Sequence, residues 1–182
     1  MTTKLPPLLG LIACLISLCH AATLEVDAGH SRIQVDAKAT GHAFTGTLEK
    51  FSAKVAGDAN TLAPTSFDLS WNFVDLKTAD ADRDAEMIKW LGGGQPQGAF
   101  KFVKSWTDKQ GVTNAQGTLT IHGVSTTVYF PYTVKKDRDT VTISGKVSLD
   151  YQTFNLPLVR AMVVMTVDPQ LVVNFQVTGK VK

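Results

Sequence analysis

Apolar and polar side chains alternate with a period of two along most of the chain. In one stretch, Phe67, Leu69 and Trp71 alternate with polar residues, and the same rhythm recurs in segments 32–39, 100–102, 118–122, 128–134, 141–149 and 171–177. Successive side chains of a strand point to opposite faces of its sheet. The alternation therefore predicts several strands, each with one apolar and one solvated face.

Turn-forming residues separate these segments. Gly, Asp and Asn cluster at 57–60, and similar groups lie at 108–111, 122–123 and 137–139. Short strands at this spacing are typical of an antiparallel sandwich or barrel. A closed barrel is the more economical solution, because it leaves no sheet edge exposed.

One segment, residues 80–91, has a helical pattern instead. Ala81, Ala85, Ile88 and Leu91 recur at intervals of three and four, and three aspartates fall in the first turn. Acidic groups there are favoured by the helix dipole, and the glycines at 92–94 provide a stop. The prediction is an all-β domain with one short helix near residues 80–91.

The N-terminus has the features of a signal peptide. Lys4 precedes an apolar run of about a dozen residues, too short for a membrane span of roughly 20, and small residues follow it. We predict cleavage after Ala21, which leaves a single domain, 22–182, in the periplasm or outside the cell. Cleavage at the lipoprotein-like Cys14 is the less favoured alternative. Cleavage after Ala21 removes Cys14 and Cys19, the only cysteines of the chain, so the mature domain would contain no disulfide.

Charge and composition narrow the function classes. The whole chain carries a formal charge of +2, with lysines interleaved among acids. No basic stripe indicates nucleic acid, and no second apolar segment indicates a membrane span, although a transient membrane contact stays open. Oligomeric state is not indicated.

Catalytic signals are weak. His30, His42 and His122 could bind zinc if the fold gathered them, but they lack the spacing typical of ligands. No nucleophile elbow or mature cysteine is present. We therefore predict no catalytic residue, no metal site and no cofactor, with a metal-dependent hydrolase as the least favoured alternative.

Aromatic residues gather on the apolar strand faces. They either fill a core, as in every domain, or line a cavity, since a barrel of about eight strands has room for one elongated apolar guest. The periodicity alone leaves both open. A filled core would suit a stress-response or protein-interaction module.

A set of ordered motifs carries a resemblance to a known family. These are Asp27-Ala-Gly-His-Ser-Arg-Ile33, Gly46-Thr-Leu-Glu-Lys-Phe51, Leu76-Lys-Thr78 before Arg83-Asp84, and Gly117-Thr-Leu-Thr-Ile-His-Gly123. In this order they resemble the YceI family of exported, lipocalin-like proteins that bind polyisoprenoids. The resemblance extends from about residue 24 to 181.

The resemblance implies a lipocalin-like antiparallel barrel holding an isoprenoid lipid, such as a quinone or polyprenyl phosphate, as a non-enzymatic carrier or reservoir. Arg83 is the candidate head-group residue, and anchoring of the helix is its alternative role. The candidate lipid-binding residues are Phe44, Phe67, Trp71, Phe73, Ile88, Leu91, Phe100, Phe102, Phe130, Phe154 and Phe175.

One motif departs from the family pattern. The family carries an Arg-x-Asp-Phe-Gly-like sequence on a late strand, and this chain has Tyr151-Gln-Thr-Phe-Asn155 there. Only Phe154 is retained. If the polar groups of the motif orient a ligand or hold the end of the barrel, this chain does so differently.

Overall fold

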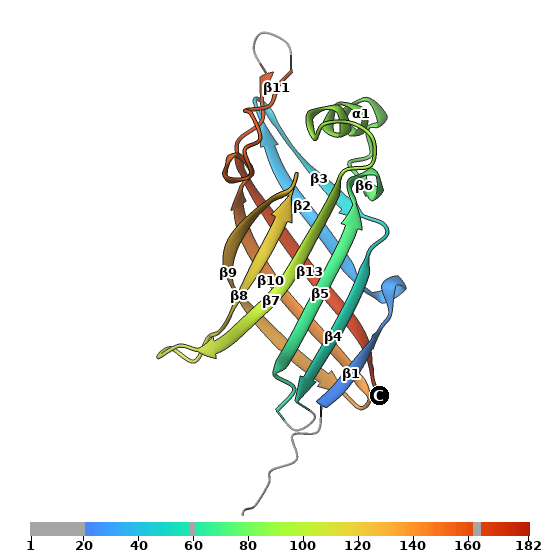
Figure 1. Cartoon of the computed structure of the whole chain (residues 1–182), viewed down its shortest axis with the longest axis vertical. Coiled ribbons are helices and arrows are strands. Elements are labelled where there is room, and N and C mark those ends of the chain that lie inside the picture. The colour runs from blue at the N-terminus through green and yellow to red at the C-terminus, as the bar shows by residue number, and fades with distance from the viewer. Residues whose placement is uncertain (1–20, 59–60, 162–164) are drawn as a thin grey trace, which may run out of the picture.

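The alternating segments form the wall of a closed barrel (Figure 1). The computed structural model describes residues 21–58, 61–161 and 165–182. The strands are β1 (Ala21–Val26), β2 (Arg32–Ala39), β3 (His42–Leu48), β4 (Ser52–Asp58), β5 (Pro64–Asn72), β6 (Leu76–Lys77), β7 (Gln97–Thr107), β8 (Thr113–Ile121), β9 (Val124–Asp137), β10 (Thr140–Asp150), β11 (Arg160–Ala161), β12 (Met165–Thr166) and β13 (Gln170–Val181). The helical elements are η1 (Ala28–His30), η2 (Phe73–Asp75), α1 (Ala81–Trp90) and η3 (Tyr151–Phe154).

The wall closes through antiparallel pairs in the order β1, β4, β5, β7, β8, β9, β10 and β13, with β13 pairing back to β1. Strands β2, β3 and β6 continue β1, β4 and β5 beyond local breaks. Accordingly, β13 pairs with β1 near its C-terminal end and with β2 through residues 172–176. The prediction of an antiparallel, roughly eight-stranded barrel with one short helix is confirmed.

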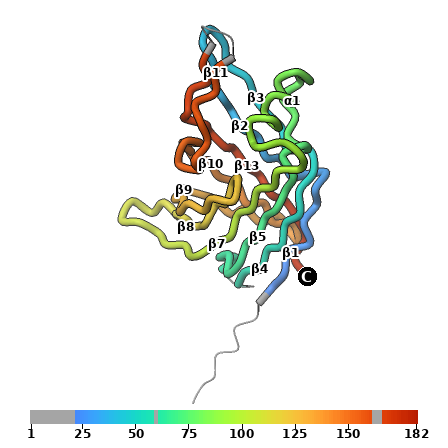
Figure 2. The backbone as a smooth tube through the Cα atoms, turned by 45° about the horizontal axis from the view of Figure 1, so that its top comes forward, coloured from blue at the N-terminus to red at the C-terminus, as the bar shows by residue number. Residues whose placement is uncertain are grey.

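The two ends of the barrel differ. Helix α1, the β2–β3 and β8–β9 turns and residues 151–161 and 165–169 lie at one end, which we call the helix end (Figures 1 and 2). The short turns between β7 and β8 and between β9 and β10 lie at the other end, with the C-terminus. Buried Val55, Val141 and Ile143 pack the interior near that second end.

Helix α1 begins as its sequence predicts. The side chain of Asp80 caps it by accepting a hydrogen bond from the Arg83 amide at 3.0 Å, and Asp82 and Asp84 lie in the first turn. Gly92 follows the last turn with φ of +95°, a left-handed conformation that favours glycine. The helix therefore starts and stops where local chemistry dictates.

Strand β9 changes partner at Pro131. Residues up to Pro131 pair with β8, whereas residues 132–137 pair with β10. Proline has no amide hydrogen, which suits it to a point where a ladder is interrupted. Helix η3 packs against β9, and its Phe154 is 1% exposed. The motif that departs from the family pattern is thus part of the packing of the barrel wall.

Candidate ligand-binding cavity

A cavity of about 1230 Å³ occupies the helix-end half of the barrel. The side chains that the strands contribute to its wall are almost all apolar. They are Ile33, Val35, Ala37, Ala39, His42, Phe44, Leu48, Phe67, Leu69, Trp71, Leu76, Phe100, Leu119, Ile121, Val128, Phe130, Val147, Leu149, Leu171, Val173, Phe175 and Val177, together with Arg160 and Thr166 of the β11–β12 ribbon. This composition suits a long apolar guest.

Among the described residues, charged groups meet the cavity only at the helix end. The acids there are Asp80, Asp82 and Glu86, and the cations are Arg83 and Lys89 of α1 and Arg160 of β11. Several of these side chains are solvent-exposed, so the cavity reaches solvent beside them at the helix end, and we call this opening the mouth. A guest would therefore place its chain in an uncharged interior and any polar head group at the mouth.

Four phenylalanine rings form the floor of the cavity. Their centroids are 5.9 Å apart for Phe67–Phe100, 5.8 Å for Phe100–Phe130 and 5.5 Å for Phe130–Phe175. The first and last pairs are edge-to-face, a favourable geometry for aromatic rings. Because the rings come from β5, β7, β9 and β13, they cross the barrel and separate the cavity from the packed second end.

Eight of the eleven predicted lipid-binding residues line the cavity. They are Phe44, Phe67, Trp71, Phe73, Leu91, Phe100, Phe130 and Phe175. The other three, Ile88, Phe102 and Phe154, pack with the hydrophobic core but do not line the cavity. Phe154 lies instead in η3, which packs against β9 of the barrel wall.

Arg83 holds the start of α1 in place. Its Nε donates to Thr78 Oγ1 at 2.9 Å, and Nη2 donates to the Thr78 carbonyl at 2.8 Å. Its third nitrogen, Nη1, lies 3.7 Å from Asp80, and its guanidinium lies 4.3 Å from the centre of the Phe44 ring. Asp84 completes the cluster by accepting from the Thr78 hydroxyl at 2.6 Å. The geometry fits the anchoring role, and a head group could reach only the Nη1 side.

Arg160 is a second cation at the mouth, and the sequence analysis missed it. Within the described part of the chain, it has no hydrogen-bond or ion-pair partner, whereas Lys89 pairs with Glu86 at 2.6 Å. The sequence gives little indication of Arg160 as a site residue, because it lies on a two-residue strand with no clear hydrophobic period.

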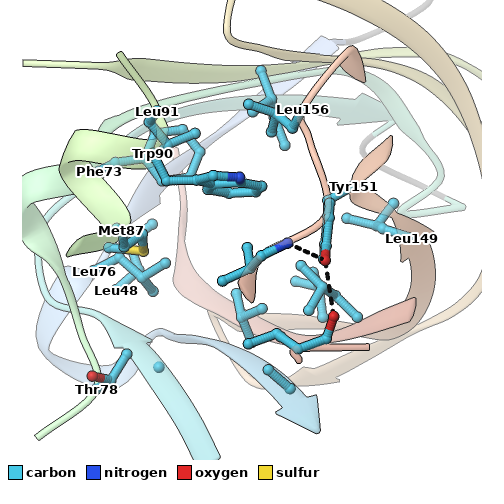
Figure 3. Close-up of a pocket in the computed structure, with 18 of the residues that line it drawn as sticks. Leu48, Phe73, Leu76, Thr78, Met87, Trp90, Leu91, Leu149, Tyr151 and Leu156 are labelled. Carbon is cyan, nitrogen blue, oxygen red and sulfur yellow. Dashed lines mark hydrogen bonds between the residues drawn. The ribbon is translucent and has the colours of Figure 1, made fainter. Parts of the chain in front are cut away.

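Trp90 and Tyr151 both line the cavity and pack against each other (Figure 3). Trp90 Nε1 donates to the Pro157 carbonyl at 2.9 Å, and its ring packs edge-to-face on Tyr151 at 5.1 Å. The Tyr151 hydroxyl donates to the Val167 carbonyl at 2.9 Å and accepts from the Val159 amide at 3.1 Å. Burial raises the pKa of this phenol. The pair therefore ties α1 to the backbone at Pro157, Val159 and Val167.

The other divergent motif positions are satisfied locally. Thr153 Oγ1 donates to the Asp150 carbonyl at 2.7 Å, and the Asp150 carboxylate accepts from the Gln152 amide at 2.9 Å. Asn155 adopts φ of +58°, a left-handed conformation that asparagine tolerates better than most residues and that the family glycine would suit. These residues hold the end of the barrel rather than face the cavity.

The three histidines are not gathered. His30 lies in η1, where its Nδ1 is 2.8 Å from the Asp27 carboxylate and the hydrogen bond lowers the pKa of Asp27. His42 lines the mouth, 6.1 Å from the Phe44 ring, and His122 lies in the β8–β9 turn. Across the described residues, no three potential ligands group to hold a metal ion.

The chain thus forms a closed, eight-stranded antiparallel β-barrel that encloses a deep apolar cavity. More specifically, the chain belongs to the family of proteins with a YceI-like domain, whose model matches residues 24–179. No curated protein matches the chain significantly.

Solved structures share this fold. BcnA from Burkholderia cenocepacia is similar with a TM-score of 0.72 and 21% identity, covering 86% of this chain and 100% of BcnA. The YceI protein of Campylobacter jejuni is similar with a TM-score of 0.57 and 18% identity, covering 75% of this chain and 84% of that protein. At these identities the likeness establishes the fold.

Proposed function

We propose that this protein is a non-enzymatic, periplasmic binding protein that holds a long isoprenoid lipid, a quinone or a polyprenyl phosphate, as a carrier or reservoir. The observation that carries the proposal is the apolar cavity of about 1230 Å³. A long chain of repeating branched units matches an apolar, uncharged interior, whereas a compact polar metabolite would leave its polar groups unpaired there.

The size of the cavity supports a long guest. A water-sized group occupies roughly 30 Å³ in a liquid, so the cavity has room for on the order of 40 non-hydrogen atoms. Each buried CH₂ contributes about 0.8 kcal/mol, and ordering a flexible chain offsets much of that gain. Binding can therefore be tight without many polar contacts.

The position of the charges supports a polar head group at the mouth. Arg160 is free to bind a phosphate or a quinone carbonyl, and Arg83 contributes at most one side of its guanidinium. A forked arginine contact suits either oxygen acceptor. The head group would remain at the solvent boundary, where a charged group loses little hydration.

The N-terminal sequence supports export. We propose removal of residues 1–21, which leaves one domain, and the family match begins at residue 24. Within the described ranges, no helix is both long and apolar enough to cross a membrane. A periplasmic position would place the protein beside the membranes in which isoprenoid lipids reside.

Two neighbouring valines on β13 provide a matched test. Val173 lines the cavity and Val172 does not. We expect Val173→Trp to fill part of the cavity and weaken the binding of long prenyl alcohols at least tenfold, because displaced methylenes each contribute about 0.8 kcal/mol. Val172→Trp should bind like the parent protein.

Titration by intrinsic fluorescence, with urea unfolding of both variants to confirm the fold, measures the difference. Equal binding by both folded variants would contradict a guest in the cavity. Absence of binding by the parent protein would instead favour the interaction module, the alternative function.

A further inference from the structure

The outer face of β7, β8 and β9 carries an exposed aromatic pair. Trp106 is 40% exposed and Tyr129 is 63% exposed. Their ring centroids are 6.4 Å apart at an interplanar angle of 71°. Large aromatic side chains are usually buried in a monomer, so an exposed pair indicates an interaction surface. We call this surface the aromatic face.

A β-bulge turns Trp106 outward. Phe100 and Phe102 point inward on β7, and simple alternation would point Trp106 inward as well. The pairing with β8 shifts between Phe102 and Lys104, so Val103 is an extra residue. After this shift Trp106 pairs with Asn114, next to buried Ala115 on β8, and therefore faces outward. Bulges of this kind re-aim side chains.

The aromatic face has positive surroundings. Lys104 on β7 pairs with Gln116 on β8, which in turn pairs with Tyr129 on β9, so all three side chains lie on the outer face. Further cations are Lys101 on β7, which lies opposite Asp68, and Lys109 in the β7–β8 turn. The acid of that turn, Asp108, is held by the amides of Gln110 and Val112 and by Asn114. Among the outward residues of β7 and β8, none is acidic.

We propose that the aromatic face docks the protein reversibly on an anionic lipid bilayer. Tryptophan and tyrosine favour the headgroup region of a bilayer, and nearby lysines are attracted to anionic lipids. A protein partner fits less well, because two rings on a convex barrel wall lack the broad, well-packed core of a protein interface. The face lies toward the end opposite α1, so docking there leaves the mouth accessible. This proposal does not depend on the ligand of the cavity.

Sedimentation with vesicles tests the proposal, using protein purified from the exporting host with its N-terminus determined by mass spectrometry. We expect binding to vesicles of equal parts phosphatidylcholine and phosphatidylglycerol, and none to phosphatidylcholine alone. Trp106→Ser combined with Tyr129→Ser should weaken binding at least tenfold, because it removes most of the exposed apolar area. Lys104→Gln should weaken it about fivefold.

Lys38→Gln is the matched charge control, because Lys38 is an exposed lysine on β2 with no ion-pair partner in the described structure. It should bind like the parent. A second readout keeps Trp106 as the sole tryptophan in a Trp71→Phe, Trp90→Phe background, in which bromine-labelled phosphatidylglycerol should quench its emission. Unquenched emission, equal binding by all variants, or binding independent of anionic lipid would overturn the proposal.

Discussion

The hydroxyl of Tyr151 forms a hydrogen-bonded bridge between two backbone segments at the helix end, and its removal tests whether that bridge stabilises the fold. The residue is 4% exposed. Its hydroxyl bridges the Val159 amide and the Val167 carbonyl, while the Val167 amide donates to the Val159 carbonyl at 3.0 Å. Tyr151→Phe keeps the ring against Trp90 but leaves a backbone donor and an acceptor without partners.

The expected cost is about 2 kcal/mol, because each lost hydrogen bond between partly buried neutral groups contributes about 1 kcal/mol. In a domain of this size, that corresponds to a decrease in Tm of roughly 4 to 8 °C. Urea unfolding followed by circular dichroism measures the free energy of unfolding directly.

Tyr132→Phe is the matched control. Tyr132 is 6% exposed on β9, and its hydroxyl has no hydrogen-bond partner among the described residues. We expect its loss to change the free energy of unfolding by less than about 0.5 kcal/mol. If both variants lose the same stability, the bridging role of Tyr151 is wrong.

Three further predictions concern stability and binding. Burial raises the pKa of Tyr151, so its stabilising contribution is complete below the unfolded pKa of about 10 and is lost as pH rises through the folded pKa. The parent protein should therefore lose stability above pH 10 more steeply than Tyr151→Phe. Urea unfolding at several pH values measures this, and an equal loss of stability in both proteins would contradict it. Arg83→Gln should lower the free energy of unfolding by about 2 kcal/mol by removing the Thr78 hydrogen bonds; a selective loss of prenyl phosphate over prenyl alcohol binding in titrations would instead indicate a head-group role. Gly145→Ala should cost about 1 to 3 kcal/mol, because its Cβ would lie 2.5 Å from the Phe175 ring and 2.9 Å from a backbone carbonyl; unchanged urea unfolding would show that the ring moves freely.

The wall of the barrel could be predicted because its signal is local. Period-two alternation and turn residues mark each strand, and the capped, glycine-terminated pattern marks α1. Closure is a consequence of pairing, which requires a match between β1 and β13 at the two ends of the sequence. No local pattern contains that information, and the barrel was expected from the need to cover sheet edges and from family resemblance.

The cavity could be predicted only in part. Inward positions that line a cavity and those that fill a core have the same period, so Phe130 and Ile143 look alike in the sequence. Phe102 and Phe154 were grouped with the cavity residues because they are aromatic, but a bulge follows the first and the second lies in a 3₁₀ turn. Whether Phe102 and Phe154 line the cavity depends on the backbone path and strand pairing, which the local sequence pattern does not contain.

Trp90 and Tyr151 were missed for a different reason. Each bonds across a long sequence interval, Trp90 to Pro157 and Tyr151 to Val167. The only available signal was the replacement of the family arginine by Tyr151. That signal indicated a departure at this position, and the structure shows a hydroxyl bridge there.

The most direct test of the proposed function is lipid extraction of the protein purified from its native compartment, followed by mass spectrometry of the extract. We expect one predominant isoprenoid lipid near one molecule per protein, and a matching loss from Val173→Trp but not from Val172→Trp. An extract without isoprenoids, from folded protein that also fails to bind added prenyl lipids, would contradict the proposed function.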